Sequence, residues 1–127
     1  MHENEIAKVV VDLALKIHKA LGPGLLESVY EAILVYEIRK AGLKVERQKH
    51  LPVIWDGQEM DIEFRIDLLV EDKLVVELKA AEKMEKVFAR QTLTYVRLGD
   101  KRLGLLINFG GELLKDNVER IINGILP

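Results

Sequence analysis

The chain has 127 residues, of which 49% are hydrophobic and 31% are charged, and its formal net charge is −2. This balance is that of an ordinary globular protein, and the length predicts a single domain over residues 1–127. The absence of cysteine excludes disulfide frameworks, thiol catalysis and thiolate metal sites, and it fits a cytoplasmic location. No apolar run approaches the ~18 residues that cross a bilayer, so no membrane contact is expected.

The net charge also argues against a protein that coats nucleic acid non-specifically. Such proteins are usually basic, because their Lys and Arg side chains displace counterions from phosphates. A chain with a net charge of −2 therefore has to make any nucleic-acid contact locally.

Two helices are predicted first. Apolar residues at gaps of three and four over positions 6–21 predict a helix with Asn4 as its N-cap, ended by Gly22-Pro23-Gly24. A second helix follows at once, with apolar residues over positions 26–38, and Gly42 ends it.

The pattern then changes to a period of two. Residues 44–55 are rich in β-formers, Asp56-Gly57 predicts a hairpin turn, and residues 60–70 alternate between apolar and polar. The short polar turn Glu71-Asp72-Lys73 leads into a further alternating segment, residues 74–79. Three successive strands are therefore expected.

The rest of the chain predicts a helix over about 82–98 and an interior strand over 103–109 that is apolar on both faces. A short extra strand at 113–114 and a last helix from Asp116 to Ile122 are also expected. The predicted order is ααβββαβα, an α/β fold with a central mixed sheet flanked by helices.

The turn at 71–73 sets the pairing of the two strands that it joins. If it leaves three residues unpaired, the opposed pairs include Val70 with Leu74, Asp67 with Glu77, and Arg65 with Lys79. The same register gathers one apolar layer on the other face: Ile66, Leu68, Val70, Leu74, Val76 and Leu78.

Two carboxylates and an ammonium thereby collect on one face. Asp67 and Glu77 repel each other unless a cation compensates them, and carboxylates, a backbone carbonyl at Leu78 and waters suit Mg²⁺. Lys79 could orient or activate a water, which would make a hydrolytic site for a phosphodiester. A solvated hairpin face with inert ion pairs explains the same residues, and spacing alone does not decide between the two interpretations.

Asp67 followed by Glu77-Leu78-Lys79 resembles the D…(D/E)xK pattern of the PD-(D/E)XK nuclease superfamily, although Ile66 stands where a proline is usually quoted. Residues 24–30, Gly-Leu-Leu-Glu-Ser-Val-Tyr, are similar to the motif that names the GxxExxY protein family, a set of small prokaryotic proteins. Further segments resemble that family from about residue 5 to 123, among them 21–24, 67–70, 76–80, Gln91 with Tyr95, and 105–110.

The resemblance implies a restriction-endonuclease-like α/β core and a nuclease that hydrolyses DNA or RNA with Mg²⁺ or Mn²⁺. It implies Asp67, Glu77 and the carbonyl of Leu78 as metal ligands, with Lys79 at the water. Glu27, on an early helix, and Gln91 would complete the catalytic set. Gln91 and Tyr95 also match the QxxxY motif of RecB-type branches, and side chains four apart share a helix face.

Several of these residues have structural interpretations as well. With Gly24 as N-cap, Glu27 would occupy the capping-box position of the second helix. Tyr30 is expected in the core with its hydroxyl at the edge of the site, and Gln91 and Tyr95 would equally anchor the third helix to the sheet.

A basic stripe is expected on the third helix, formed by Lys83, Lys86, Arg90 and Arg97. It is either a track for phosphates or a solvated face. His18 is expected to be an internally satisfied histidine, and Trp55 to cover the end of the hairpin instead of stacking on a base.

The same fold also serves binding proteins, because fold does not determine function. The alternative to a nuclease is a non-catalytic module that binds nucleic acid or a protein. A homodimer with twofold symmetry would supply a larger groove for either function.

Overall fold

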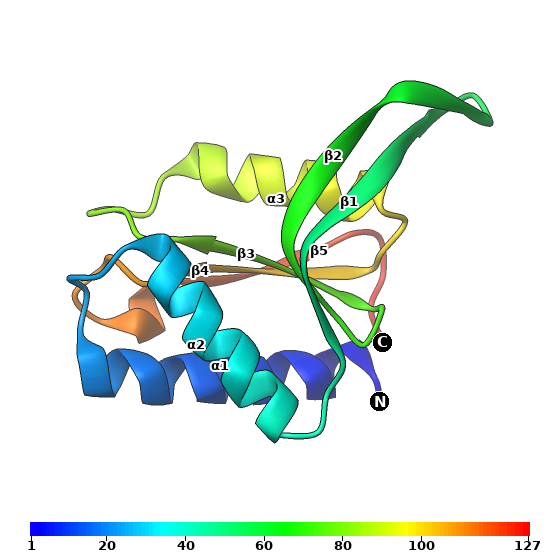
Figure 1. Cartoon of the computed structure of the whole chain (residues 1–127). Coiled ribbons are helices and arrows are strands. Elements are labelled where there is room, and N and C mark those ends of the chain that lie inside the picture. Colours follow the sequence, from blue (N-terminus) through cyan, green and yellow to red (C-terminus); the bar gives the residue numbers. More distant parts are fainter.

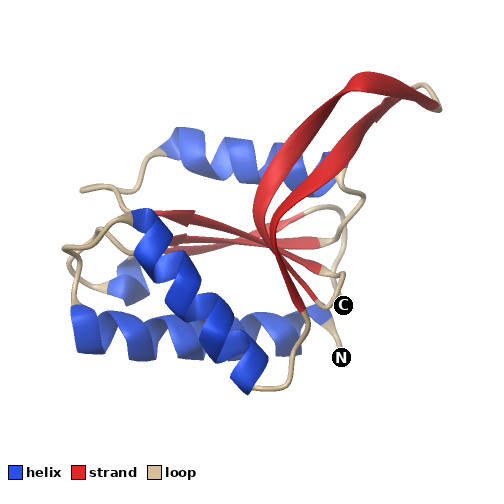
Figure 2. Ribbon diagram, viewed as in Figure 1, coloured by secondary structure: helices blue, strands red, loops and turns tan.

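The computed structural model describes all 127 residues. A five-stranded sheet of order β1-β2-β3-β4-β5 forms its centre. Helices α1 (Glu3–Leu21) and α2 (Glu27–Lys40) cover one face of the sheet, and α3 (Lys86–Leu98) covers the other (Figure 1, Figure 2). The predicted fold class, a mixed sheet flanked by helices, is confirmed. No helix combines the length and apolar character needed to span a membrane.

The strands are β1 (Val45–Trp55), β2 (Gln58–Val70), β3 (Leu74–Lys79), β4 (Leu103–Asn108) and β5 (Val118–Ile122). β3 and β4 pair in parallel, while the other neighbours pair antiparallel. Every residue of β4 is buried, as expected for an interior strand that is apolar on both faces.

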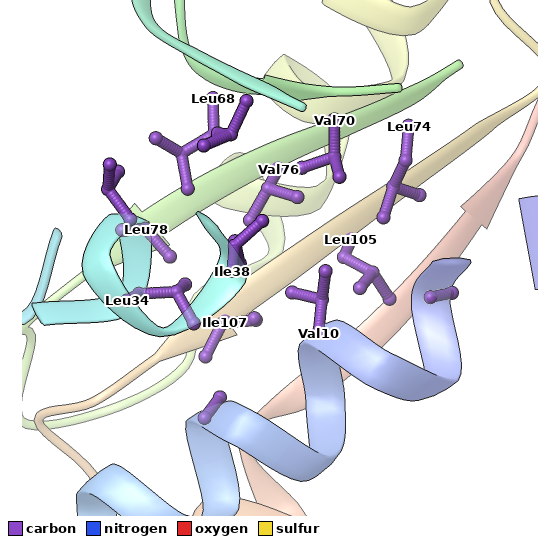
Figure 3. Close-up of a cluster of buried hydrophobic side chains, with 14 of the residues drawn as sticks. Val10, Leu34, Ile38, Leu68, Val70, Leu74, Val76, Leu78, Leu105 and Ile107 are labelled. Atoms are coloured by element: carbon purple, nitrogen blue, oxygen red, sulfur yellow. The ribbon is translucent and has the colours of Figure 1, made fainter. Parts of the chain in front are cut away.

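The main core lies between the sheet and the helices α1 and α2. Leu34 and Ile38 of α2 and Val10 of α1 project onto apolar side chains of β3 and β4, such as Val76 and Leu105 (Figure 3). A smaller cluster lies on the other face, under α3, and consists of Ile66, Leu69, Val75 and Val96. The sheet is therefore buried on both sides where β2, β3 and β4 run together.

Two histidines make hydrogen bonds near the two ends of α1. His2, not Asn4, caps α1: its Nδ1 accepts from the Asn4 N–H at 3.0 Å, and the Glu5 carboxylate accepts from the His2 N–H at 3.0 Å. His18 is buried and its Nε2 lies 2.9 Å from the Gly111 carbonyl oxygen, so it is the satisfied histidine that was expected.

The predicted register between β2 and β3 is confirmed, because Val70 lies opposite Leu74 and Leu68 opposite Val76. Beyond the pair of Leu68 with Val76, β2 and β3 no longer pair with each other. Arg65 lies opposite His50 of β1 and not opposite Lys79. The expected single apolar layer is also wrong at Ile66, which belongs to the cluster under α3, because Ile66 lies beyond the last β2–β3 pair, Leu68 with Val76, where β2 no longer runs alongside β3.

Past the end of β3, strands β1 and β2 continue as a two-stranded arm that projects from the rest of the molecule (Figure 1). Asp56 and Gly57 have φ values of 53° and 72°, which suit the tight hairpin turn that the Asp-Gly pair predicts. Trp55 does not cover the arm's end, since 75% of its surface is exposed. Residues 51–64 of the arm contain four acidic residues and no basic one, counting Asp56, Glu59, Asp61 and Glu63.

The third helix begins at Lys86, four residues later than the start predicted at 82. The start of the preceding segment is tied to Asn108, a buried side chain at the end of β4. Asn108 Oδ1 accepts from the Ala81 N–H, and Asn108 Nδ2 donates to the Ala81 carbonyl, both at 2.9 Å. Ala81 is thereby bound to the sheet, and the chain bends at Glu82 and Lys83 before the helix begins.

The helix predicted over 116–122 is wrong, and so is the short strand predicted at 113–114. Residues Leu114–Asp116 form a 3₁₀ turn, and β5 then pairs with β4. The Asn117 side chain donates to the Leu113 carbonyl at 2.8 Å, and the Asn117 carbonyl accepts from the Asn108 N–H at 2.9 Å. These bonds direct the β-branched residues of the segment onto the open edge of β4.

The packing of α3 on β4 predicts a stability difference between two glycines. A Cβ at Gly104 would lie 2.6 Å from Val96 Cγ2 and 3.1 Å from Thr92 Cγ2, whereas a Cβ at Gly24 would meet nothing within 4 Å. Gly104→Ala should lower the free energy of unfolding in urea by about 1–3 kcal/mol, since overpacking strains the helix–sheet contact. Gly24→Ala should change it by less than ~0.5 kcal/mol. Equal effects of the two substitutions would contradict the packing described.

Candidate active site

The candidate site lies where β2 and β3 separate. After the Leu68–Val76 pair, the Asp67 carboxylate takes the place of a ladder partner: its Oδ2 accepts from the Leu78 N–H at 2.8 Å. In return the Asp67 N–H donates to Glu77 Oε1 at 3.3 Å. The two carboxylates that the register predicted to be neighbours are therefore brought together, each bonded to the backbone of the opposite strand.

Glu77 is 4% exposed, and its position is electrostatically costly for a charged group. Burial and, after it, the neighbouring negative charge of Asp67 together raise the pKa of Glu77 to about 9, although Lys79 acts in the opposite direction. Without a cation, Glu77 is therefore protonated at neutral pH. A bound cation would relieve the repulsion between the buried Glu77 and the half-buried Asp67.

The donor set suits a hard divalent cation. Asp67 and Glu77 supply carboxylate oxygens, and the Leu78 carbonyl faces the same gap as the Leu78 N–H, because both groups of a strand residue point to one edge. No point is surrounded by three or more His, Cys, Asp or Glu side chains that could hold a metal ion. A cation here would therefore keep several waters, which is the usual preference of Mg²⁺.

Lys79 lies at the end of β3, on the side of the sheet that α3 covers. Its Nζ lies 3.3 Å from Gln91 Oε1 and 5.0 Å from the centre of the Phe88 ring, so two residues of α3 orient the ammonium. Gln91 Nε2 in turn donates to the Tyr95 hydroxyl at 3.1 Å. The Gln91–Tyr95 pair thus connects the helix to the lysine of the ExK motif.

Glu27 approaches from the other side, as the first residue of α2. The N-cap is Leu26 and not Gly24, so the capping-box interpretation of Glu27 is wrong. Partial burial raises the pKa of Glu27, and the negative charge of Asp67 raises it further, with Lys79 opposing. Its carboxylate is therefore within electrostatic range of both Asp67 and Lys79.

Tyr30 explains how Glu27 is held there. It is fully buried, stacks on Phe109 with 4.5 Å between ring centres, and accepts from the Leu25 N–H at 3.2 Å. Its hydroxyl also donates to the Gly22 carbonyl. The tyrosine thereby fixes the loop that leads into α2. Its ring lies in the core, as expected, while its hydroxyl bonds to that loop and to no residue of the candidate site.

Three further residues that the sequence analysis did not single out connect to Asp67. Gln48 Nε2 lies 2.6 Å from Glu31 Oε1 and 3.4 Å from Asp67 Oδ1, and Arg47 pairs with Glu31 at 3.0 Å. Glu31 lies four residues after Glu27, on the same helix face, and that spacing was a usable signal. Nothing in the sequence marks Gln48, whose position depends on its positive φ.

The predicted basic stripe is present only in part. Lys86, Arg90 and Arg97 are exposed on α3, but Lys83 lies before the helix begins. None of these four residues forms an ion pair. The helix therefore offers uncompensated positive charge next to Gln91.

The raised pKa of Glu77 predicts a pH dependence of stability in the metal-free protein. Between pH 4.5 and about 9 the folded state keeps a proton on Glu77 that the unfolded state releases, so the free energy of unfolding falls as pH rises through this window. The loss should reach about 1.4 kcal/mol per pH unit, relative to Glu77→Gln, which cannot ionise. Urea unfolding in chelator from pH 5.5 to 8.5 measures this, and parallel curves for the two proteins would contradict it.

Comparison with known proteins places this arrangement in a family. Residues 4–121 match the model of the PD-(D/E)XK nuclease superfamily, which covers α1 through most of β5. A comparison with curated proteins finds no match. Members of this superfamily commonly use divalent metal ions. The match extends over nearly the whole chain and includes Asp67, Glu77 and Lys79, and the chain belongs to the PD-(D/E)XK nuclease superfamily.

Proposed function

We propose that this protein is a nuclease that hydrolyses phosphodiester bonds of DNA or RNA with Mg²⁺ or Mn²⁺. The observation that carries the proposal is the pair of carboxylates, Asp67 and Glu77, joined across the fork between β2 and β3 with Lys79 two residues further along. A buried acid, Glu77, beside the half-buried Asp67 is an unfavourable arrangement to keep for structural reasons alone, since Lys79 only partly offsets its cost.

In this proposal Asp67, Glu77 and the Leu78 carbonyl hold the ion. A divalent cation at that position supplies charge stabilisation at the phosphate and makes a water more acidic. Lys79 positions the attacking water by hydrogen bonding, and Gln91 holds the lysine's ammonium at 3.3 Å. Glu27, at the rim and with a raised pKa, is suited to accept or hold a proton near the site.

We also propose that, within the superfamily, the chain belongs to the GxxExxY family. It is supported by the roles of the motif residues, since Tyr30 fixes the loop after Gly22 and Glu27 begins the helix that points at Asp67. Gly24 contributes no steric requirement in this fold, because its φ is ordinary and a Cβ there would meet nothing.

The nucleic acid would contact α3 and the loop before it. Tyr95, Lys83, Lys86 and Arg90 lie within eight residues of Gln91 in the chain, and the three basic residues carry no internal ion pair. These side chains would bind phosphates beside the scissile bond and add affinity without sequence preference.

A second candidate function is a binding module without catalysis. It is favoured by one observation: the acidic pair lacks a third carboxylate, histidine or cysteine that converges with it. A binding module would keep the fold of the site without depending on a cation.

The proposal predicts metal-dependent cleavage that depends on Lys79. Labelled single-stranded and double-stranded DNA and RNA are incubated with Mn²⁺ or with chelator and resolved on denaturing gels. Lys79→Ala should lower the cleavage rate by at least about 100-fold, since a positioned proton-transfer group contributes on that scale. Lys8→Ala, which removes a charge paired only with Asp12 on α1, is the matched control and should cleave like wild type.

Two results would count against a nuclease. Cleavage that persists equally in Lys79→Ala would mean that another site or a contaminant acts. Absence of cleavage on all four substrates, with Mn²⁺ bound, would favour the binding module.

A further inference from the structure

The outer face of α2 carries an open basic groove that the sequence analysis did not identify. It has a volume of about 450 Å³ and is lined by Ala32, Val35, Tyr36, Arg39, Lys40 and Arg47. Half of these residues are basic, although the chain has a net charge of −2. The groove is therefore a local concentration of positive charge on an acidic protein.

The charges in the groove are only partly compensated. Arg47 pairs with Glu31, but neither Arg39 nor Lys40 forms an ion pair. Arg39 Nη2 donates to the Val45 carbonyl at 3.4 Å, which orients the guanidinium and leaves its other donors available. Two consecutive exposed residues thus carry positive charge that no acidic side chain compensates.

An exposed aromatic ring lines the same groove. Tyr36 is 64% exposed, and Lys40 Nζ lies 6.0 Å from the centre of its ring. A tyrosine beside two free cations is the combination by which proteins bind single strands, since the ring stacks on a base while the cations contact phosphates. A duplex offers no free base face to such a ring.

A chain of side-chain bonds connects the groove to the candidate active site. Arg47 in its wall binds Glu31, and the other oxygen of Glu31 accepts from Gln48, which reaches Asp67 Oδ1 at 3.4 Å. Arg47 therefore lies on the side of the groove from which two further side chains, Glu31 and Gln48, reach Asp67. The arm on the far end of β1 and β2 does not compete, because its acidic residues repel phosphates.

We propose that the groove formed by Tyr36, Arg39, Lys40 and Arg47 binds single-stranded nucleic acid and guides it to the site at Asp67. The inference rests on the proposed function and names its substrate class: a strand with unpaired bases. Tyr36 stacks on one base, Arg39 and Lys40 each bind a phosphate, and Arg47 marks the end of the groove nearest the site.

Binding is measured separately from cleavage. Fluorescence anisotropy of a short labelled oligothymidylate is recorded in chelator, over a series of salt concentrations, with the full chain. Tyr36→Ala should weaken binding about ten-fold and Tyr36→Phe should retain it, because the ring provides the stacking. Arg39→Ala/Lys40→Ala should also reduce the slope of log affinity against log salt by about 1.4, at ~0.7 per phosphate for single strands.

The control is Lys8→Ala/Lys115→Ala, which removes the same charge outside the groove and should bind as the wild type does. Equal losses in both double variants, or no loss in Tyr36→Ala, would overturn the assignment. So would a duplex or polyglutamate that binds equally well and with the same dependence on Tyr36.

The two proposals fail in different ways. Strand binding that depends on the groove, without any cleavage, supports the groove and rejects the nuclease. Lys79-dependent cleavage with normal strand binding by the groove variants rejects the groove alone.

Discussion

The bond from the Leu78 N–H to the Asp67 carboxylate is the interaction on which the candidate site depends. It lies where β2 and β3 stop pairing, and there a backbone donor of the central strand has lost its ladder partner. A buried unsatisfied N–H is costly, so a side chain has to replace the missing carbonyl. Asp67 does so, and Glu77 accepts the corresponding N–H of Asp67 in return. The hydrogen bonds that satisfy the backbone N–H groups at the end of the β2–β3 ladder thus bring the two acids together.

The surrounding elements bring the other residues to that fork. α3 crosses from β3 to β4 and is held close to the sheet at Gly104, so Gln91 reaches Lys79. On the opposite face α2 begins with Glu27 because Tyr30 fixes the loop before it. The site therefore collects residues from both helical layers and from the central strands. Small changes in the packing of either layer would misplace it.

Much of this site was predictable from the sequence because it depends on local periodicity. The alternation in 60–70 and 74–79, with a three-residue turn, fixed the register and hence the pairing of Asp67 with Glu77. Residues outside such periodic runs were not predictable. Gln48 requires a positive φ, Lys83 lies in a segment tied to Asn108, and the last segment forms an edge strand because β4 offers it backbone partners. In each case a long-range hydrogen bond overrides the local preference.

The most direct test of a cation site at the fork is a crystal structure of the protein soaked with Mn²⁺, with anomalous scattering used to locate the ion. The account predicts an anomalous peak within about 2.5 Å of oxygens of Asp67 and Glu77 and of the Leu78 carbonyl, with waters completing the coordination. A protein saturated with Mn²⁺ that shows no peak there, or only peaks at the acidic residues of the arm, would contradict it.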